Sequence, residues 1–227
     1  MDAIHDPAPG PGAEAVAMVM LPGAHDRAQD LVEQGFVRAL RARGLAADAV
    51  VADARIDSYL ERSVVAELER DVIAPLRQRG RARVWLMGIS LGCTGALSYA
   101  REHAGAIEGV LLLAPFLGTR GLIAEITNAG GLQGWQPGTI APEDDERRLL
   151  AWLRQYRAGD PTLPRIHLGY GTGDRYAPAS VLLARQLPAQ QVMTVEGGGH
   201  DWPTWLTLWE RWLDGGAWAP LPGAAGS

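Results

Sequence analysis

One serine of this sequence lies in a pattern that is typical of a reactive hydroxyl. The pentapeptide 88–92, Gly-Ile-Ser-Leu-Gly, follows the apolar run 83–87 and precedes a stretch that favours a helix. A tight, strained turn from a strand into a helix pushes its central side chain outward, and the flanking positions must be glycine because a larger side chain would collide with neighbouring backbone. The sequence therefore predicts that Ser90 is a nucleophile.

Two glycine-rich clusters nearer the C-terminus supply the partners that a serine nucleophile needs. Asp174 ends a Gly-Thr-Gly-Asp run that directly follows the apolar stretch 166–170, and His200 ends a Gly-Gly-Gly-His run that comes after the stretch 192–195; both stretches are typical of a strand. A serine hydroxyl is a poor nucleophile until a base takes its proton, and a carboxylate orients a histidine for that task. All three residues follow the carboxyl end of a predicted strand, where open parallel sheets place their sites. The pattern predicts acyl transfer by Ser90, His200 and Asp174.

Other residues of the same types compete for these roles. Asp160 precedes a proline and Asp201 lies beside His200. Aspartates in such positions usually form turns or cap helices, which favours Asp174 as the acid. Cys93 is predicted to be a small buried residue on the helix after the serine, because a catalytic thiol needs a histidine partner of its own.

Six short apolar runs are predicted to form the sheet that positions these residues. They are mostly apolar throughout, as buried parallel strands are. The runs are 16–21, 49–52, 84–87, 110–113, 166–170 and 192–195. Because amphipathic stretches alternate with them, the sequence predicts an α/β fold: a mainly parallel sheet of about six strands with helices on both faces.

The helices of this fold are predicted from apolar residues at three- and four-residue spacing. Residues 30–43 and 63–79 show this spacing, and each stretch ends before a glycine. Pro75 lies inside the second stretch, where it cannot donate a backbone hydrogen bond, so we expect a kink or an early end there. Residues 91–103 form the helix after the serine. Four tryptophans between 202 and 212 predict a buried helix face rather than a stacking surface for sugars or bases.

The segment 118–164 is longer than a crossover between two strands needs. It is predicted to form two short helices joined by a loop, and it is a candidate small lid over the site. Trp135 and Trp152 are its candidate pocket residues. The four acids at 143–146 open the second helix, where carboxylates suit the exposed amides and the positive end of the helix dipole. We therefore expect these acids to cap the helix and not to catalyse.

The length and composition indicate one domain. A chain of 227 residues that is 47% hydrophobic can bury a substantial core. We divide the chain into a flexible N-terminal tail at 1–15, a domain at 16–213 and a C-terminal tail at 214–227. Residues 1–15 lack the basic start and apolar block of an export signal, so we expect a cytoplasmic protein.

Several functional classes are excluded by composition. A net charge of -5 without a basic cluster argues against nucleic acid as a partner, and no apolar run approaches the ~20 residues that span a bilayer. The 21 basic residues are all arginine, so Schiff-base chemistry and a phosphate-binding P-loop lack the lysine that they require. The single cysteine forms no internal disulfide, and no zinc or dinucleotide motif is complete. We expect no metal and no cofactor.

The order serine, acid, histidine resembles the α/β-hydrolase superfamily, and the resemblance extends from about Val16 to Leu213. It implies an α/β-hydrolase fold with a reduced sheet, because residues 1–15 are too few for two preceding strands. It also implies an oxyanion hole. The matching donors are the amide of Ala24, in the loop after the first strand, and the amide of Leu91, directly after the nucleophile.

Departures from the family pattern bear on the substrate more than on the chemistry. Pro22 stands where many members have histidine, and Cys93 stands where a third glycine is common. His25, next to the oxyanion loop, is a candidate pocket residue. An equal alternative for His25 is a loop histidine that is bonded to Asp26 or to backbone.

The resemblance implies a serine esterase whose partner is a small-molecule carboxylic ester. The limited apolar surface expected of 118–164 predicts that short acyl chains are preferred. A thioesterase is the alternative within hydrolases, because the same three residues serve both reactions. The alternative from another class is a binding protein that keeps the fold without catalysis.

Overall fold

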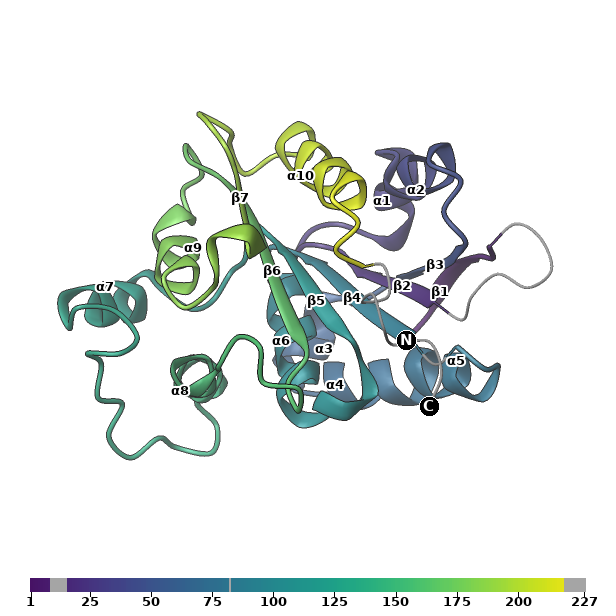
Figure 1. The fold of residues 1–227 in the computed structure, drawn as a ribbon. Coiled ribbons are helices and arrows are strands. Elements are labelled where there is room, and N and C mark those ends of the chain that lie inside the picture. The colour runs from purple at the N-terminus through teal and green to yellow at the C-terminus, as the bar shows by residue number, and fades with distance from the viewer. Residues whose placement is uncertain (9–15, 82, 219–227) are drawn as a thin grey trace.

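The computed structural model describes residues 1–8, 16–81 and 83–218. Within these ranges a seven-stranded sheet has the order β1-β3-β2-β4-β5-β6-β7 (Figure 1). Every neighbouring pair is parallel except β1, which runs antiparallel to β3. The strands are β1 (Ala3–Asp6), β2 (Val16–Leu21), β3 (Ala47–Ala52), β4 (Arg83–Ile89), β5 (Gly109–Leu113), β6 (Arg165–Gly171) and β7 (Val192–Val195).

Helices cover both faces of this sheet. One face carries α1, α2 and α10, whereas α3 to α6 lie against the other, with α7 to α9 beyond β6 (Figure 1). The α-helices are α1 (Ala28–Glu33), α2 (Phe36–Ala42), α3 (Ile56–Leu60), α4 (Val64–Leu68), α5 (Ala74–Gln78), α6 (Leu91–Glu102), α7 (Arg120–Asn128), α8 (Asp145–Gln155), α9 (Ala177–Ala184) and α10 (Trp202–Asp214).

Alternating side chains of the central strands divide the core into two clusters. Successive residues of a strand point to opposite faces, so buried strands are apolar at every position. In β4, Leu86 packs with the cluster under α6, and its neighbours Trp85 and Met87 pack with the cluster under α10. The α10 cluster contains the tryptophans of the C-terminal helix, which confirms the predicted buried face; Trp205, Trp209 and Trp212 are all buried.

All six predicted strands are present, and the sheet has one more than expected. The seventh is β1, which lies inside the predicted flexible tail at 1–15, so that prediction is wrong for Ala3–Asp6. Arg41 holds this strand: its guanidinium pairs with the Asp6 carboxylate and donates to the Asp6 carbonyl at 2.7 Å. Because these contacts come from residues that are distant in the sequence, the short edge strand has no local hydrophobic pattern that would predict it. Residues 9–15 of the predicted tail, and 219–227 of the predicted C-terminal tail, lie outside the described residues.

Two predicted helices are interrupted. The stretch 30–43 forms α1 and α2, because Gly35 between them has φ 94°, a left-handed conformation that glycine adopts without strain. The stretch 63–79 continues past Pro75, but its middle turn, Glu69–Ile73, is π-helical. Proline at 75 clashes with a regular α-helical carbonyl four residues earlier, and the wider turn relieves that clash.

Candidate active site

Ser90 occupies the turn between β4 and α6 in an unusual backbone conformation. Its φ is 51° and its ψ is -111°, a strained combination for a residue with a side chain. The Ser90 N–H donates to the Leu113 carbonyl at 3.0 Å, and the Ser90 carbonyl accepts from the Phe116 N–H at 3.1 Å. These hydrogen bonds to β5 and to the loop after it hold the strained residue in place.

The two glycines of the pentapeptide are required by close backbone contacts. A Cβ on Gly88 would lie 2.5 Å from backbone atoms of Gly92 and Cys93. A Cβ on Gly92 would lie 2.3 Å from the Leu21 carbonyl oxygen, in the strand that leads to the oxyanion loop. No L side chain can occupy such a space without backbone movement. The predicted turn geometry is therefore present.

The structure brings Ser90, His200 and Asp174 into one hydrogen-bonded chain. His200 Nε2 lies 3.0 Å from Ser90 Oγ, and His200 Nδ1 lies 2.8 Å from Asp174 Oδ2. The other Asp174 oxygen accepts from the Tyr176 N–H at 2.7 Å, and only 5% of Asp174 is exposed. With the ring proton on Nδ1, directed at the carboxylate, Nε2 can accept the serine proton.

The loops that carry the acid and the histidine are joined by their backbones. The Gly173 N–H donates to the Gly198 carbonyl at 3.0 Å, and the Thr172 N–H donates to the Val195 carbonyl at 3.0 Å. A Cβ on Gly171 would lie 2.1 Å from the Gly198 oxygen. The glycines of both runs thus allow the close approach that places Asp174 beside His200.

Aromatic rings flank the histidine on two sides. The centroid of the His200 ring lies 4.8 Å from that of Tyr176 and 5.0 Å from that of Trp205. Both contacts are edge-to-face, and Trp205 is part of the buried face of α10. This packing fixes the ring orientation that the hydrogen bonds to serine and aspartate require.

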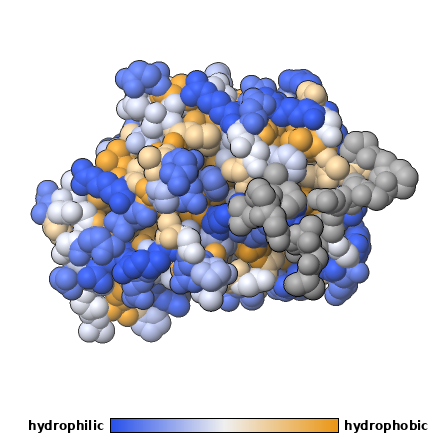
Figure 2. Space-filling model, viewed as in Figure 1, coloured by the Kyte–Doolittle hydropathy of each residue, from blue (hydrophilic) through white to orange (hydrophobic). Residues whose placement is uncertain are grey.

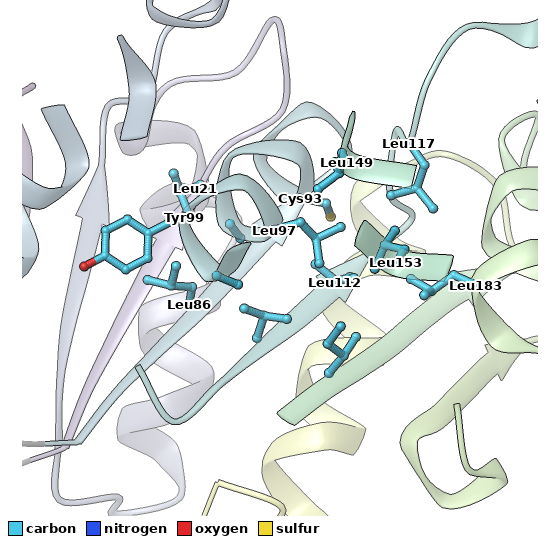
Figure 3. Close-up of a cluster of buried hydrophobic side chains, with 14 of the residues drawn as sticks. Leu21, Leu86, Cys93, Leu97, Tyr99, Leu112, Leu117, Leu149, Leu153 and Leu183 are labelled. Carbon is cyan, nitrogen blue, oxygen red and sulfur yellow. The ribbon is translucent and has the colours of Figure 1, made fainter. Parts of the chain in front are cut away.

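The competing residues have structural roles. The Asp201 side chain caps α10 by accepting from the Thr204 N–H at 3.0 Å, and Asp160 accepts from the Thr162 N–H at 2.9 Å in a turn. Cys93 is buried among leucines (Figure 3), and its Sγ donates to the Gly88 carbonyl at 2.9 Å. Burial raises the pKa of the thiol, which keeps it protonated and unreactive. These findings agree with the roles expected from the sequence.

The predicted oxyanion donors come from two segments next to the serine. Leu91 is the first residue of α6, where an N–H has no partner within the helix. Ala24 lies in the loop after β2, and this loop packs on α6 because Gly92 touches both the Leu21 and the Pro22 carbonyls. Among the described residues, neither the Ala24 nor the Leu91 amide donates to another backbone carbonyl.

The oxyanion loop also carries two ionisable residues. His25 is exposed at its tip, and its predicted contact with substrate stays a prediction. Asp26 is partly buried beside Gly23, and no sequence motif predicts a role for it in the site. Burial, followed by the nearby Asp30 carboxylate, raises the pKa of Asp26, whereas His25 and His200 act in the opposite direction. Only its position, two residues after Ala24, connects it to the site in the sequence.

Trp135 is a core residue, and its prediction as a pocket residue is wrong. Only 2% of its surface is exposed, and it packs in the same cluster as α8. Its indole N–H donates to Glu125 at 2.8 Å, and the Arg147 guanidinium lies 5.9 Å from its ring centroid. Its cluster also contains leucine and isoleucine side chains from both ends of 118–164, and the loop-like local sequence does not indicate this burial.

Two surface cavities are lined by neighbours of the catalytic candidates: Leu91, next to Ser90, lines one, and Tyr176, in contact with the His200 ring, lines the other. One, of about 380 Å³, begins at Leu91 and Phe116 and follows Thr94 along α6. The other, of about 320 Å³, is lined by Tyr176 and by apolar residues of α7 and α9. The rings of Phe116 and Tyr176, with centroids 6.0 Å apart, separate the two. Volumes of this size suit small ligands.

Within the acidic run at 143–146, Asp144 has the capping role that the sequence predicts. The Asp144 side chain accepts from the Arg147 N–H at 3.0 Å at the start of α8, which begins at Asp145. Glu146 accepts from the Thr119 N–H at 2.9 Å. These carboxylates tie the helix to neighbouring loops and do not reach the serine.

Comparison with solved structures relates this architecture to hydrolases. The S-formylglutathione hydrolase FrmB from Staphylococcus aureus matches with TM-score 0.59 and 12% identity, over 87% of this chain and 79% of that one. Est1E from Butyrivibrio proteoclasticus matches with TM-score 0.59 and 16% identity, over 94% of this chain and 91% of that one. A ferulic acid esterase matches with TM-score 0.55 and 17% identity, over 87% of this chain and 82% of that one.

These similarities establish the architecture of the chain. It has the α/β-hydrolase fold, with a seven-stranded, mostly parallel sheet in the described residues. No family model matches the sequence. No curated protein sequence matches it either. The fold is thus recognisable in three dimensions at identities of 12% to 17%.

The described residues contain neither a candidate membrane-spanning helix nor a candidate metal-binding cluster. In the ranges that the structure covers, no helix combines the length and the apolar character needed to cross a membrane. Within the same ranges, no group of three or more histidine, cysteine or acidic side chains is arranged to hold a metal ion. The chemistry considered below uses side chains and backbone amides of the chain itself.

Proposed function

We propose that this protein is a serine hydrolase that cleaves carboxylic esters through an acyl-enzyme on Ser90. The observation that carries the proposal is the continuous chain from Ser90 Oγ to His200, at 3.0 Å, and from His200 to Asp174, at 2.8 Å. A serine becomes a nucleophile when a base of this kind accepts its proton. The esterases among the similar structures also support ester hydrolysis.

The reaction follows from the positions of these groups. As Ser90 Oγ attacks the ester carbonyl carbon, His200 Nε2 takes the hydroxyl proton, and Asp174 stabilises the resulting imidazolium. Negative charge gathers on the carbonyl oxygen, where fixed amide donors such as those of Ala24 and Leu91 typically contribute about 3 kcal/mol each. His200 then protonates the leaving alcohol. Water, activated by the same histidine, releases the acid from Ser90.

We infer that short acyl groups are preferred. Most large apolar side chains of 118–164 are buried, and none of them is among the exposed large hydrophobic residues of the described chain. The surface over α7 and α8 carries mostly hydrophilic residues (Figure 2). Apart from the cavity of about 320 Å³ beside Tyr176, a long acyl chain would find little apolar surface there, so each methylene that extends beyond this cavity would bring less than the usual ~0.8 kcal/mol of burial.

Labelling with a fluorophosphonate tests whether the serine is activated without requiring the natural substrate. We expect the wild-type protein to be labelled and to hydrolyse p-nitrophenyl esters with acyl chains of roughly two to six carbons. Ser90→Ala should abolish labelling and lower turnover by about 10⁶-fold, with the circular dichroism spectrum unchanged. Cys93→Ala is the matched control and should retain labelling.

Different outcomes separate the competing functions. A folded wild-type protein that is neither labelled nor active would support the binding-protein alternative. Faster turnover of an acyl thioester than of the ester with the same acyl group would favour a thioesterase. A steep rise of kcat/KM through long acyl chains, measured below micelle formation, would contradict the preference for short chains.

A further inference from the structure

The Asp26 carboxylate lies close to the serine, against the oxyanion loop. A Cβ built on Gly23 would lie 2.6 Å from Asp26 Oδ2 and 3.7 Å from Ser90 Cβ, so the two side chains flank the same glycine. The Asp26 N–H donates to the Gly23 carbonyl at 3.2 Å, which folds the loop into a turn that holds the acid there. Asp26 is partly buried, and His200 is among the groups that act on its charge.

No arginine forms an ion pair with this carboxylate among the described residues. The ionisable groups that act on it are Asp30, His25 and His200, and none of them is an arginine. The adjacent Arg27 has its guanidinium directed at Asp53, at 3.8 Å. Other aspartates of the protein pair with arginine, among them Asp48, Asp145 and Asp214. Asp26 therefore presents an acid that has a hydrogen bond with the Gly23 backbone but no arginine partner, close to Ser90.

An acid in this position is unfavourable for the hydrolysis of an uncharged ester. The tetrahedral intermediate develops negative charge on an oxygen held by the Ala24 and Leu91 amides, and the Asp26 carboxylate repels that charge. Partial burial without a cation adds a desolvation cost for the carboxylate itself. A positively charged group on the substrate would offset both effects, since it would pair with Asp26 when the site is occupied.

We propose that Asp26 selects esters that carry a cationic group, such as a quaternary ammonium, a few ångströms from the scissile carbonyl. The proposal rests on the esterase function proposed above and defines a class of substrate for the same site. The cation would pair with the carboxylate at the oxyanion loop while Ser90 attacks the neighbouring carbonyl. Asp26 would contribute no proton transfer, so its effect should depend on the charge of the substrate.

Isosteric esters that differ only in charge test this selectivity. The first pair is 2-(trimethylammonio)ethyl acetate and 3,3-dimethylbutyl acetate, which places the cation on the alcohol. The second pair is ethyl trimethylammonioacetate and ethyl 3,3-dimethylbutanoate, which places it on the acyl group. For each pair, the ratio of kcat/KM for the cationic to the neutral ester is measured in the wild type and in Asp26→Asn. Comparing proteins in this way cancels the intrinsic reactivity of the esters.

We expect Asp26→Asn to lower this ratio about ten-fold for at least one pair, as is typical when one charge of a partly buried pair is removed. The neutral ester should be hydrolysed as fast as before or faster. Asparagine keeps an acceptor oxygen for the loop, so the turn should survive. Glu33→Gln, which removes an exposed acid on α1, is the matched control and should leave both ratios unchanged.

Other outcomes would overturn the proposal. Equal losses for the cationic and neutral esters in Asp26→Asn would show that the residue supports the loop or His200 and does not recognise charge. If the ratio of kcat/KM for the cationic to the neutral ester is the same in Asp26→Asn as in the wild type for both pairs, the cation does not bind at Asp26. Wild-type hydrolysis of the neutral esters establishes the esterase function separately, whereas activity on none of the four esters would contradict that function and this one together.

Discussion

The nucleophile turn at 88–92 and the segment 118–164 are held in place in different ways. In the turn, backbone touches backbone: an added Cβ on Gly92 would lie 2.3 Å from a carbonyl oxygen of β2. In 118–164, side chains make the connections. Glu125 accepts from both Trp135 and Arg147, and a Cβ on Gly121 would have no neighbour within 4 Å.

This difference suggests that the turn at 88–92 controls the reaction, whereas the segment 118–164 contributes mainly to stability. The position of the serine depends on contacts that leave no space for substitution, so the reacting atoms have one geometry. The segment 118–164 depends on hydrogen bonds, ion pairs and buried leucines that can be changed one at a time. We expect changes in the turn and its partner loops to affect turnover, and changes in 118–164 to affect mainly stability.

The acid of the site gives the largest predicted effect. Asp174→Asn should lower kcat by about 10⁴-fold, because an amide cannot hold the histidine in the tautomer that accepts the serine proton. Asp201→Asn should leave kcat within a few-fold, since asparagine also caps helices well. Steady-state kinetics with a p-nitrophenyl ester measures both. The opposite ranking would identify Asp201 as the acid.

Two glycine substitutions compare the regions directly. Gly92→Ala should cost about 3 kcal/mol of stability and at least about 10²-fold in kcat/KM, because β2 and α6 must separate and displace the serine. Gly121→Ala, in the first turn of α7, should be neutral or stabilise by up to ~0.5 kcal/mol without changing activity. Urea unfolding and kinetics on both variants provide the test. A fully active Gly92→Ala variant would show that the close backbone contacts of the turn are not needed to position Ser90.

Trp135 tests the role of 118–164 itself. Trp135→Ala should reduce the free energy of unfolding by roughly 3–5 kcal/mol, since it removes a large buried side chain. The dependence of kcat/KM on acyl length should keep its shape in the folded fraction. Trp135→Phe retains most of the ring and should cost less. A changed acyl-length profile with unchanged stability would instead place Trp135 at the substrate.

Acid should weaken the sheet at β6, through a buried histidine. His167 in β6 lies between Trp85 and Trp212, and burial, together with Arg165, lowers its pKa to about 4. An unfolded histidine titrates near ~6.5, so between these values the unfolded chain binds a proton that the folded chain rejects. The contribution of neutral His167 to the free energy of unfolding should therefore be fully present above pH ~6.5. It should fall by up to about 3 kcal/mol as the pH drops towards ~4.

A histidine variant isolates this contribution. His167→Phe should flatten the pH dependence of urea unfolding over that interval, because phenylalanine has no proton to bind. The comparison uses the difference between wild type and variant at each pH, so that carboxylates which titrate in both proteins cancel. A difference that is constant with pH would show that His167 does not control acid stability.

Local sequence patterns predicted the parts of the fold that depend on neighbouring residues. The strand-to-helix turn at Ser90 and the positions of Asp174 and His200 at strand ends were of this kind. The parts that were missed depend on distant residues. Strand β1 is stabilised by pairing with β3 and by Arg41, and Trp135 is buried in a cluster that includes side chains from both ends of its segment. The position of Asp26 beside Gly23 and Ser90 likewise becomes visible only when the loop is folded against α6.

The most direct test of the central claim is to locate the acyl group during turnover. The protein is mixed with p-nitrophenyl acetate, quenched in acid within the first turnovers and analysed by intact mass and peptide mapping. We predict one acetyl group on Ser90 in the wild type and in Cys93→Ala, and none in Ser90→Ala. Acetylation at another residue, or hydrolysis that persists in Ser90→Ala, would contradict the account.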